Sequence, residues 1–119
     1  MAVNRKRFNF SLSEKFVAAM RELSRDNAKS ASSLIETYVV QLVILPDLAE
    51  RDFAPGKLTR YQKDPEAACE LWTALRLAEK GEPGYKIIYA DVQNHPALET
   101  QKKIVGVQGI NEHDEIVMY

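Results

Sequence analysis

The sequence predicts an α+β protein in which a short strand and two helices precede a third helix and several short strands. Three observations carry this prediction. Apolar and polar residues alternate over residues 7–12, apolar residues recur at helical spacing in three later stretches, and three strand-like runs follow Gly81. The chain has 119 residues, 45% of them apolar and 28% charged, which is the composition of one globular domain or two very small ones.

A strand is expected over residues 7–12. Its apolar positions are Phe8, Phe10 and Leu12, and its polar positions are Arg7, Asn9 and Ser11. A period of two is typical of a strand with one buried and one exposed face.

Two helices are expected next. Ser13 is an N-cap residue type, and the helix after it should run to about Asp26. Ser30 or Ser32 offers the next N-cap, and the second helix should end near Leu45, before Pro46. The apolar positions are Phe16, Val17, Met20 and Leu23 in the first helix, and Leu34, Ile35, Tyr38, Val39, Leu42 and Val43 in the second.

The remainder divides into a connection and a small extension. Residues 46–63 mix proline, glycine and charge and predict a connection with a single helical turn. Asp64-Pro65-Glu66 is typical of a helix start, and the apolar stripe after it stops before Gly81. Strands are expected over residues 85–92, 104–107 and 115–119, with a hairpin connection at 111–114. The predicted domains are therefore residues 1–45, a connection over 46–63 and an α/β extension over 64–119.

The N-terminal part calls for a second chain, because a lone strand leaves its ladder hydrogen bonds unmade. Charge separates the same two regions. Residues 1–45 carry seven Lys and Arg against four Asp and Glu, and residues 46–119 carry nine against thirteen. A basic N-terminal region followed by an acidic C-terminal region can indicate a nucleic-acid contact confined to one end of the chain.

The order of these signals resembles the ribbon-helix-helix family of DNA-binding proteins, of Arc and MetJ type. The residues concerned are KRFNFSLSEKF, an apolar helix, a short turn and SASSLIETYVVQLV, within about residues 5–45. The family often has glycine in the turn, where this chain has Asn27-Ala28-Lys29. The resemblance implies an intertwined homodimer with a two-stranded ribbon above four helices. Its core would contain Phe8, Phe10, Leu12, Phe16, Met20, Leu34, Ile35, Tyr38, Val39 and Leu42.

The resemblance also implies sequence-specific binding of double-stranded DNA through the ribbon in the major groove, as in a transcriptional repressor. Arg7, Asn9 and Ser11 would contact base edges, because their side chains match the donors and acceptors displayed there. The start of the second helix would contact phosphate, since helix N-termini favour anions. The phosphate-contacting residues would be Arg5, Lys6, Lys29, Ser30, Ser32 and Ser33. Dimers could assemble further on repeated sites.

Several alternatives stay open. An antitoxin, a plasmid partition protein or a transfer accessory protein could carry the same N-terminal region, and a dimeric interaction scaffold would not bind DNA at all. Arg7, Asn9 and Ser11 could line an ordinary exposed strand, and the serines could simply cap a helix. Residues 64–119 could bind a protein partner, and their acidic balance argues against a second DNA-binding surface.

No enzymatic, cofactor, metal or membrane role is expected. The nucleophile-elbow, Walker, dinucleotide and HExxH motifs do not occur. Cys69 is the single cysteine, and with two histidines it cannot complete a tetrahedral zinc site. No apolar run approaches the ~20 residues of a membrane span and no signal peptide is recognisable, so a cytoplasmic location fits best.

Overall fold

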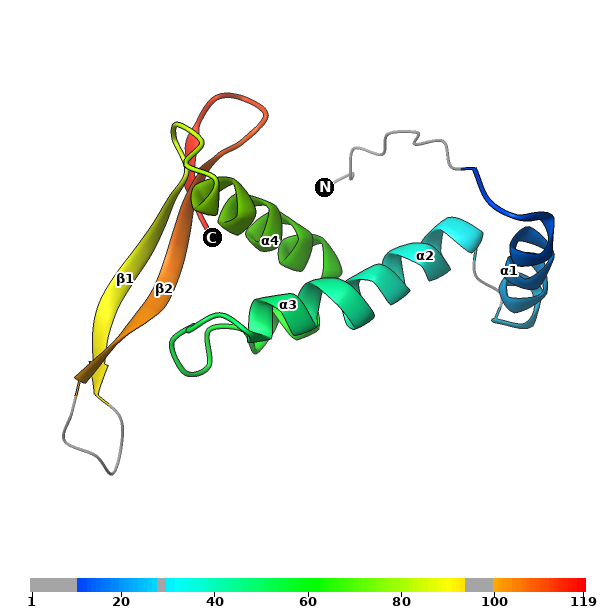
Figure 1. Ribbon diagram of the computed structural model, residues 1–119, viewed down its shortest axis with the longest axis horizontal. Coiled ribbons are helices and arrows are strands. Elements are labelled where there is room, and N and C mark those ends of the chain that lie inside the picture. Colours follow the sequence, from blue (N-terminus) through cyan, green and yellow to red (C-terminus); the bar gives the residue numbers. More distant parts are fainter. Residues whose placement is uncertain (1–10, 28–29, 94–99) are drawn as a thin grey trace. The chain divides into compact units, whose positions relative to one another are not determined.

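The computed structural model describes residues 11–27, 30–93 and 100–119. The chain divides into two compact units, unit 1 (Met1–Ile35) and unit 2 (Glu36–Tyr119). Along the chain the helices come first and the strands last (Figure 1).

The predicted ribbon-helix-helix architecture is wrong, although the fold is α+β. In the described residues every strand follows the helices, whereas a ribbon-helix-helix chain begins with its strand. Residues 7–10 of the predicted strand lie outside the described residues, and Ser11 to Ser13 have no regular secondary structure. A six-residue alternation is a weak signal by itself, because a strand is stable only where another strand accepts its hydrogen bonds.

Both N-terminal helices begin at a serine cap. Helix α1 (Glu14–Asn27) starts where the backbone N–H of Phe16 donates to the hydroxyl of Ser13 at 3.2 Å. Helix α2 (Ala31–Val39) starts in the same way, with the N–H of Ser33 donating to the hydroxyl of Ser30 at 3.1 Å. Of the two candidate caps, Ser30 is therefore the one used.

The second helix does not end before Pro46, as predicted. After α2 it continues as a π-helical turn, η1 (Val40–Ile44), and then as α3 (Leu45–Ala49). Pro46 has no N–H to donate to the carbonyl four residues earlier, which normally breaks a helix. The wider turn just before it, closed by the N–H of Leu45 donating to the carbonyl of Val40, lets the chain pass through the proline.

The whole helix spans Ala31–Ala49, and its mean hydropathy reaches 1.3 over 18 residues. By length and composition alone it would suffice to cross a membrane. Three of its side chains, Val40, Ile44 and Leu48, nevertheless pack in the core of unit 2.

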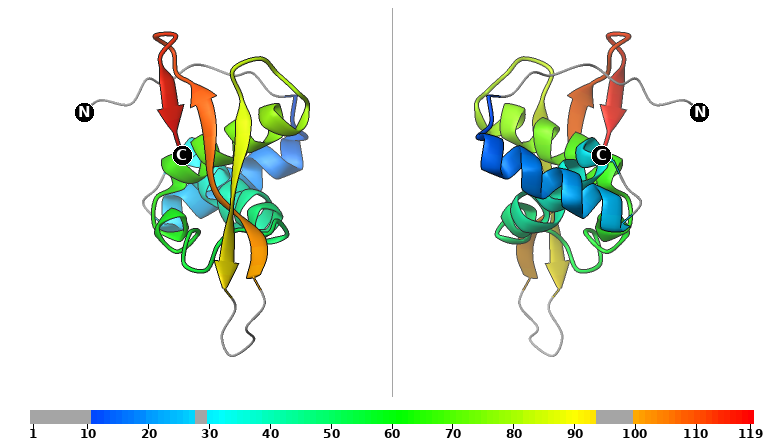
Figure 2. Two further views of the ribbon diagram at one scale, coloured as in Figure 1. Left: turned by 90° about the vertical axis from the view of Figure 1, so that its left-hand side faces the viewer. Right: turned by 90° about the vertical axis from the view of Figure 1, so that its right-hand side faces the viewer.

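Unit 2 combines the end of this helix with α4 and an antiparallel sheet. Helix α4 (Pro65–Glu79) begins at the predicted cap, where Asp64 accepts a hydrogen bond from the N–H of Ala67 at 3.1 Å. The strands are β1 (Lys86–Gln93), β2 (Thr100–Ile110) and β3 (Ile116–Met118), with β2 in the middle (Figure 2). The predicted third helix and the three strands after it are thus confirmed.

The predicted hairpin between β2 and β3 is also confirmed. The side-chain oxygen of Asn111 accepts hydrogen bonds from the N–H groups of His113 and Glu115, at 2.9 and 3.0 Å. Asp114 takes a left-handed backbone conformation with φ of 60°. Asparagine and aspartate are the non-glycine residues that best tolerate such a turn.

The predicted connection, residues 46–63, belongs to the core of unit 2. It contains α3 and the 3-10 turn η2 (Arg60–Gln62), and the N–H of Ala54 donates to the carbonyl of Ile104 at 2.8 Å. Leu48 and Tyr61 of this segment are buried. They join a core that also contains Val40, Ile44, Ala68, Leu71, Ala74, Leu75, Ile104 and Val107.

Candidate functional site

Most of the residues predicted to contact DNA lie outside the described residues. These are Arg5, Lys6, Arg7, Asn9 and Lys29. Ser11, the third predicted base contact, is exposed and precedes α1 without belonging to a strand. Because the ribbon architecture is overturned, a two-stranded ribbon is not retained as the means of contact.

The serines at the start of α2 are placed close together by the helix itself. Ser30 supplies the cap, Ser32 is exposed in the first turn, and the N–H of Ser33 is bonded to Ser30. The N-terminus of a helix carries a partial positive charge, which favours an anion. Ser30 therefore caps the helix, and contact of Ser30, Ser32 and Ser33 with phosphate remains a prediction.

The charge of the chain follows the division into units. Unit 1 carries seven Lys and Arg against three Asp and Glu, whereas unit 2 carries nine against fourteen. The net charges are therefore +4 and −5. On α1 the guanidinium of Arg25 pairs with Glu22 at 3.0 Å, but both side chains are exposed and such a pair adds little stability.

The predicted dimer core falls into three groups. Phe8 and Phe10 lie outside the described residues. Met20 and Leu34 are buried within the chain itself, and Ile35 is half-buried. The remaining members are exposed, namely Leu12, Phe16, Tyr38, Val39 and Leu42.

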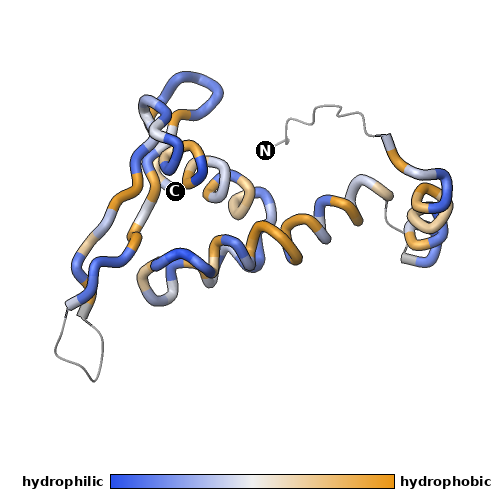
Figure 3. The backbone as a smooth tube through the Cα atoms, viewed as in Figure 1, coloured by the Kyte–Doolittle hydropathy of each residue, from blue (hydrophilic) through white to orange (hydrophobic). Residues whose placement is uncertain are grey.

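The clearest anomaly is an exposed apolar surface on the long helix, formed by Tyr38, Val39, Leu42 and Val43 and called here the helix face. The exposed fraction is 72% for Leu42 and 56% for Val43. Val40 and Ile44, on the same turns, are buried in the core of unit 2, so apolar residues occupy most positions in this part of the helix, with exposed Gln41 as the exception (Figure 3). A helix with that composition is normally covered all round. The exposure of the helix face is therefore unusual for a helix of this composition.

Sequence reasoning did not place Val43 or Leu23 in the predicted dimer core, yet both are exposed large apolar residues. Their position on the apolar stripes of the two helices was the available signal. Leu23 belongs with Leu12 and Phe16 to a second exposed apolar set, on and just before α1.

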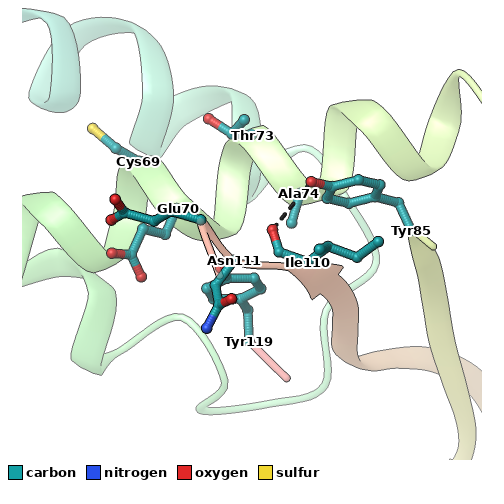
Figure 4. Close-up of a pocket in the computed structure, with 9 residues that line it drawn as sticks. Cys69, Glu70, Thr73, Ala74, Tyr85, Ile110, Asn111 and Tyr119 are labelled. Atoms are coloured by element: carbon teal, nitrogen blue, oxygen red, sulfur yellow. Dashed lines mark hydrogen bonds between the residues drawn. The ribbon is translucent and has the colours of Figure 1, made fainter. Parts of the chain in front are cut away.

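Unit 2 contains an open cavity of about 340 Å³ between α4 and the sheet (Figure 4). Cys69 and Glu70 line it from α4, and Tyr85 and Tyr119 line it from the other side, with the hydroxyl of Tyr85 donating to the carbonyl of Ile110 at 3.2 Å. Burial raises the pKa of the Cys69 thiol, and nearby carboxylates, including Glu70, raise it further. The thiol is therefore protonated near neutral pH and is a poor nucleophile.

Within residues 11–27, 30–93 and 100–119, no three or more His, Cys, Asp or Glu side chains come together as a metal site would require. The geometry thus offers an apolar face, a basic unit and an open cavity as candidates for function. No family model, curated protein or solved structure matches the chain.

Proposed function

We propose that this protein is a homodimer that binds double-stranded DNA through its basic unit 1. The observation that carries the proposal is the exposed helix face. In the sequence it follows shortly after unit 1, which has a net charge of +4. An exposed apolar patch on a helix is typical of a protein interface.

A second copy of the chain is the partner that best fits the helix face. From Thr37 to Leu45 the sequence contains no charged residue, so two copies can approach there without like-charge repulsion. The second exposed set, Leu12, Phe16 and Leu23, lies on and before α1 and gives unit 1 an exposed apolar surface of its own. Dimerisation would bury large side chains that water otherwise surrounds.

A dimer contains two copies of unit 1, which carry +8 in total. Positive charge attracts the phosphate backbone and releases counterions from it, which makes binding fall steeply with salt. Arg5, Lys6 and Lys29 are the proposed phosphate contacts, together with Ser30, Ser32 and Ser33. Arg7, Asn9 and Ser11 are the proposed base contacts, and Arg and Asn side chains can each make two hydrogen bonds to a base edge.

Specific binding at an operator would make the protein a transcriptional repressor, since an occupied operator excludes other proteins from the same DNA. A partition or transfer accessory role would use the same contacts at a different site. The helix face and the charge of unit 1 serve all of these roles equally, and DNA binding by a dimer is common to them.

The test is selection of bound sequences from a random duplex library at fixed salt, with three proteins compared. Wild type should enrich a repeated motif, and Asn9→Ala should blur it at particular positions, because one lost bidentate contact removes about 1 to 3 kcal/mol of discrimination. Gln101→Ala, which removes an exposed amide from β2, is the matched control and should enrich the wild-type motif. Failure of the wild type to bind any duplex at low salt would refute DNA binding and leave the interaction scaffold as the function.

A further inference from the structure

The excess of Asp and Glu over Lys and Arg in unit 2 is not distributed evenly along the sequence. The segment Phe53–Lys63 contains Lys57, Arg60 and Lys63 and no Asp or Glu, although unit 2 as a whole has a net charge of −5. The segment is held in place, because Phe53 and Leu58 pack against the core and Tyr61 is part of it. Lys57, Arg60 and Lys63 thus form a positive segment that is fixed to the core of an otherwise acidic unit.

Two of these cations share one anchor, the ring of Tyr61. Tyr61 is only 1% exposed. The guanidinium carbon of Arg60 lies 4.6 Å from the centre of that ring and the Nζ atom of Lys57 lies 5.9 Å from it. Arg60 also donates a hydrogen bond to the Tyr61 hydroxyl at 2.7 Å. Cation–π contacts and this bond restrict both side chains before any ligand arrives, which lowers the entropic cost of binding.

Among the described residues, the pair has no carboxylate partner, in contrast to Arg51, Arg76 and Lys103. Arg51 pairs with Asp47 and Glu79, each at 3.0 Å, and Lys103 pairs with Asp52 at 3.6 Å. Across the part of the chain that the structure describes, no carboxylate lies within ion-pair distance of Lys57 or Arg60. Burial lowers the pKa of Lys57, and the neighbouring positive charge of Arg60 lowers it further. An anion between the two groups would relieve their repulsion.

We propose that Lys57 and Arg60, positioned on the ring of Tyr61, form a binding site for a phosphate group of the DNA backbone. This inference rests on the proposed function. The guanidinium can donate two parallel hydrogen bonds to phosphate oxygens, and the ammonium adds a point charge beside it. Lys63, two residues after Tyr61, adds longer-range attraction.

The chemistry would equally hold a free phosphate, so the experiment has two arms. In the first, duplex affinity is measured by fluorescence anisotropy over a range of salt concentrations for wild type, for Lys57→Gln with Arg60→Gln, and for Lys80→Gln with Lys86→Gln. The last pair removes two exposed positive charges from unit 2 elsewhere and is the matched control. In the second arm, inorganic phosphate is titrated into wild type and the Lys57/Arg60 variant while Tyr61 and the groups around it are followed by NMR.

Each phosphate contact contributes about 0.9 to the slope of log affinity against log salt. The two cations of each chain hold one phosphate group, so their loss removes two phosphate contacts from a dimer. The slope should become shallower by about 2 in the Lys57/Arg60 variant and stay close to wild type in the control. The single variant Lys57→Arg keeps the positive charge and leaves Arg60 unchanged. Its salt slope should therefore be close to that of wild type. Circular dichroism melting of each variant separates a lost contact from a lost fold.

The outcomes separate the two proposals. If wild type binds DNA and the Lys57/Arg60 variant has the slope of the control, this site is refuted and the DNA-binding function stands. If wild type binds no duplex, the proposed function is refuted, and the second arm decides. Saturable shifts near Tyr61 that the double variant loses would support a site for free phosphate, and their absence would overturn the site altogether.

Discussion

Leu42 provides the sharpest test of the proposed homodimer, because it is the most exposed member of the helix face. Its neighbours Val40 and Ile44 are buried in the core of unit 2, whereas Leu42 is 72% exposed. Leu42→Ala should therefore leave the fold of the single chain intact and remove apolar surface from the dimer interface alone. Alanine is also the best helix former, so the helix itself should not suffer.

The size of the effect follows from that exposed fraction. Full burial of a leucine side chain contributes about 1.5 to 3 kcal/mol, so burying the exposed part of the Leu42 side chain in the dimer contributes about 1 to 2 kcal/mol. A symmetric dimer buries the residue twice, and alanine keeps one methyl group, so dimerisation should weaken by about 2 to 3 kcal/mol. The dissociation constant of the dimer should rise by about 30- to 150-fold.

Sedimentation equilibrium over a wide range of protein concentration measures this constant. Ile116→Ala is the matched control, because Ile116 of β3 is a comparably exposed apolar residue away from the helix face, and the dimer should keep its wild-type affinity. The reasoning is refuted if wild type stays monomeric at the highest concentration, or if Leu42→Ala and Ile116→Ala dissociate at the same concentration.

Three further predictions concern unit 2. Leu71 is fully buried, so Leu71→Ala should lower the free energy of unfolding by about 2 to 5 kcal/mol in urea titrations, and a loss below about 1 kcal/mol would contradict the described core. Asp64→Ala removes the N-cap of α4 and should cost about 1 kcal/mol by the same assay, whereas Asp64→Asn should cost much less. The indole N–H of Trp72 donates to Asp47 at 2.7 Å and, with the hydrogen bond from Arg51, holds the pKa of Asp47 below its ordinary value. The folded state then binds this proton less readily than the unfolded state, so stability is fully present above the unfolded value and falls as the pH drops through the folded one. Trp72 fluorescence during acid unfolding should show that loss in wild type, and Asp47→Asn should make the acid limb flatter.

Helix caps and tight turns could be predicted from the sequence because their chemistry is local. Ser13, Asp64 and the 111–114 turn each depend on a side chain that bonds to a backbone group within four residues. Such contacts form in nearly the same way whatever surrounds them.

The path of the chain around Pro46 could not be predicted in this way. Proline normally ends a helix, and the rule fails here because a π-helical turn takes up the missing hydrogen bond while Val40, Ile44 and Leu48 stay buried. The gain from burying these side chains in unit 2 comes from residues far along the chain, such as Leu71 and Val107. For the same reason the segment 46–63 looked like a connection, since Tyr61 enters the core only through contacts made elsewhere.

The candidate sites divide along the same line. The basic N-terminal region and the apolar stripes were visible in the sequence, because charge and period are properties of the chain order. Which apolar residues stay uncovered, and which two cations rest on the ring of Tyr61, depends on contacts between distant segments. The wrong ribbon prediction has the same cause, because a strand exists only where a second strand pairs with it. Local hydrogen bonds and hydrophobic period therefore follow from the order of residues, whereas pairing, burial and exposure are decided when remote segments meet.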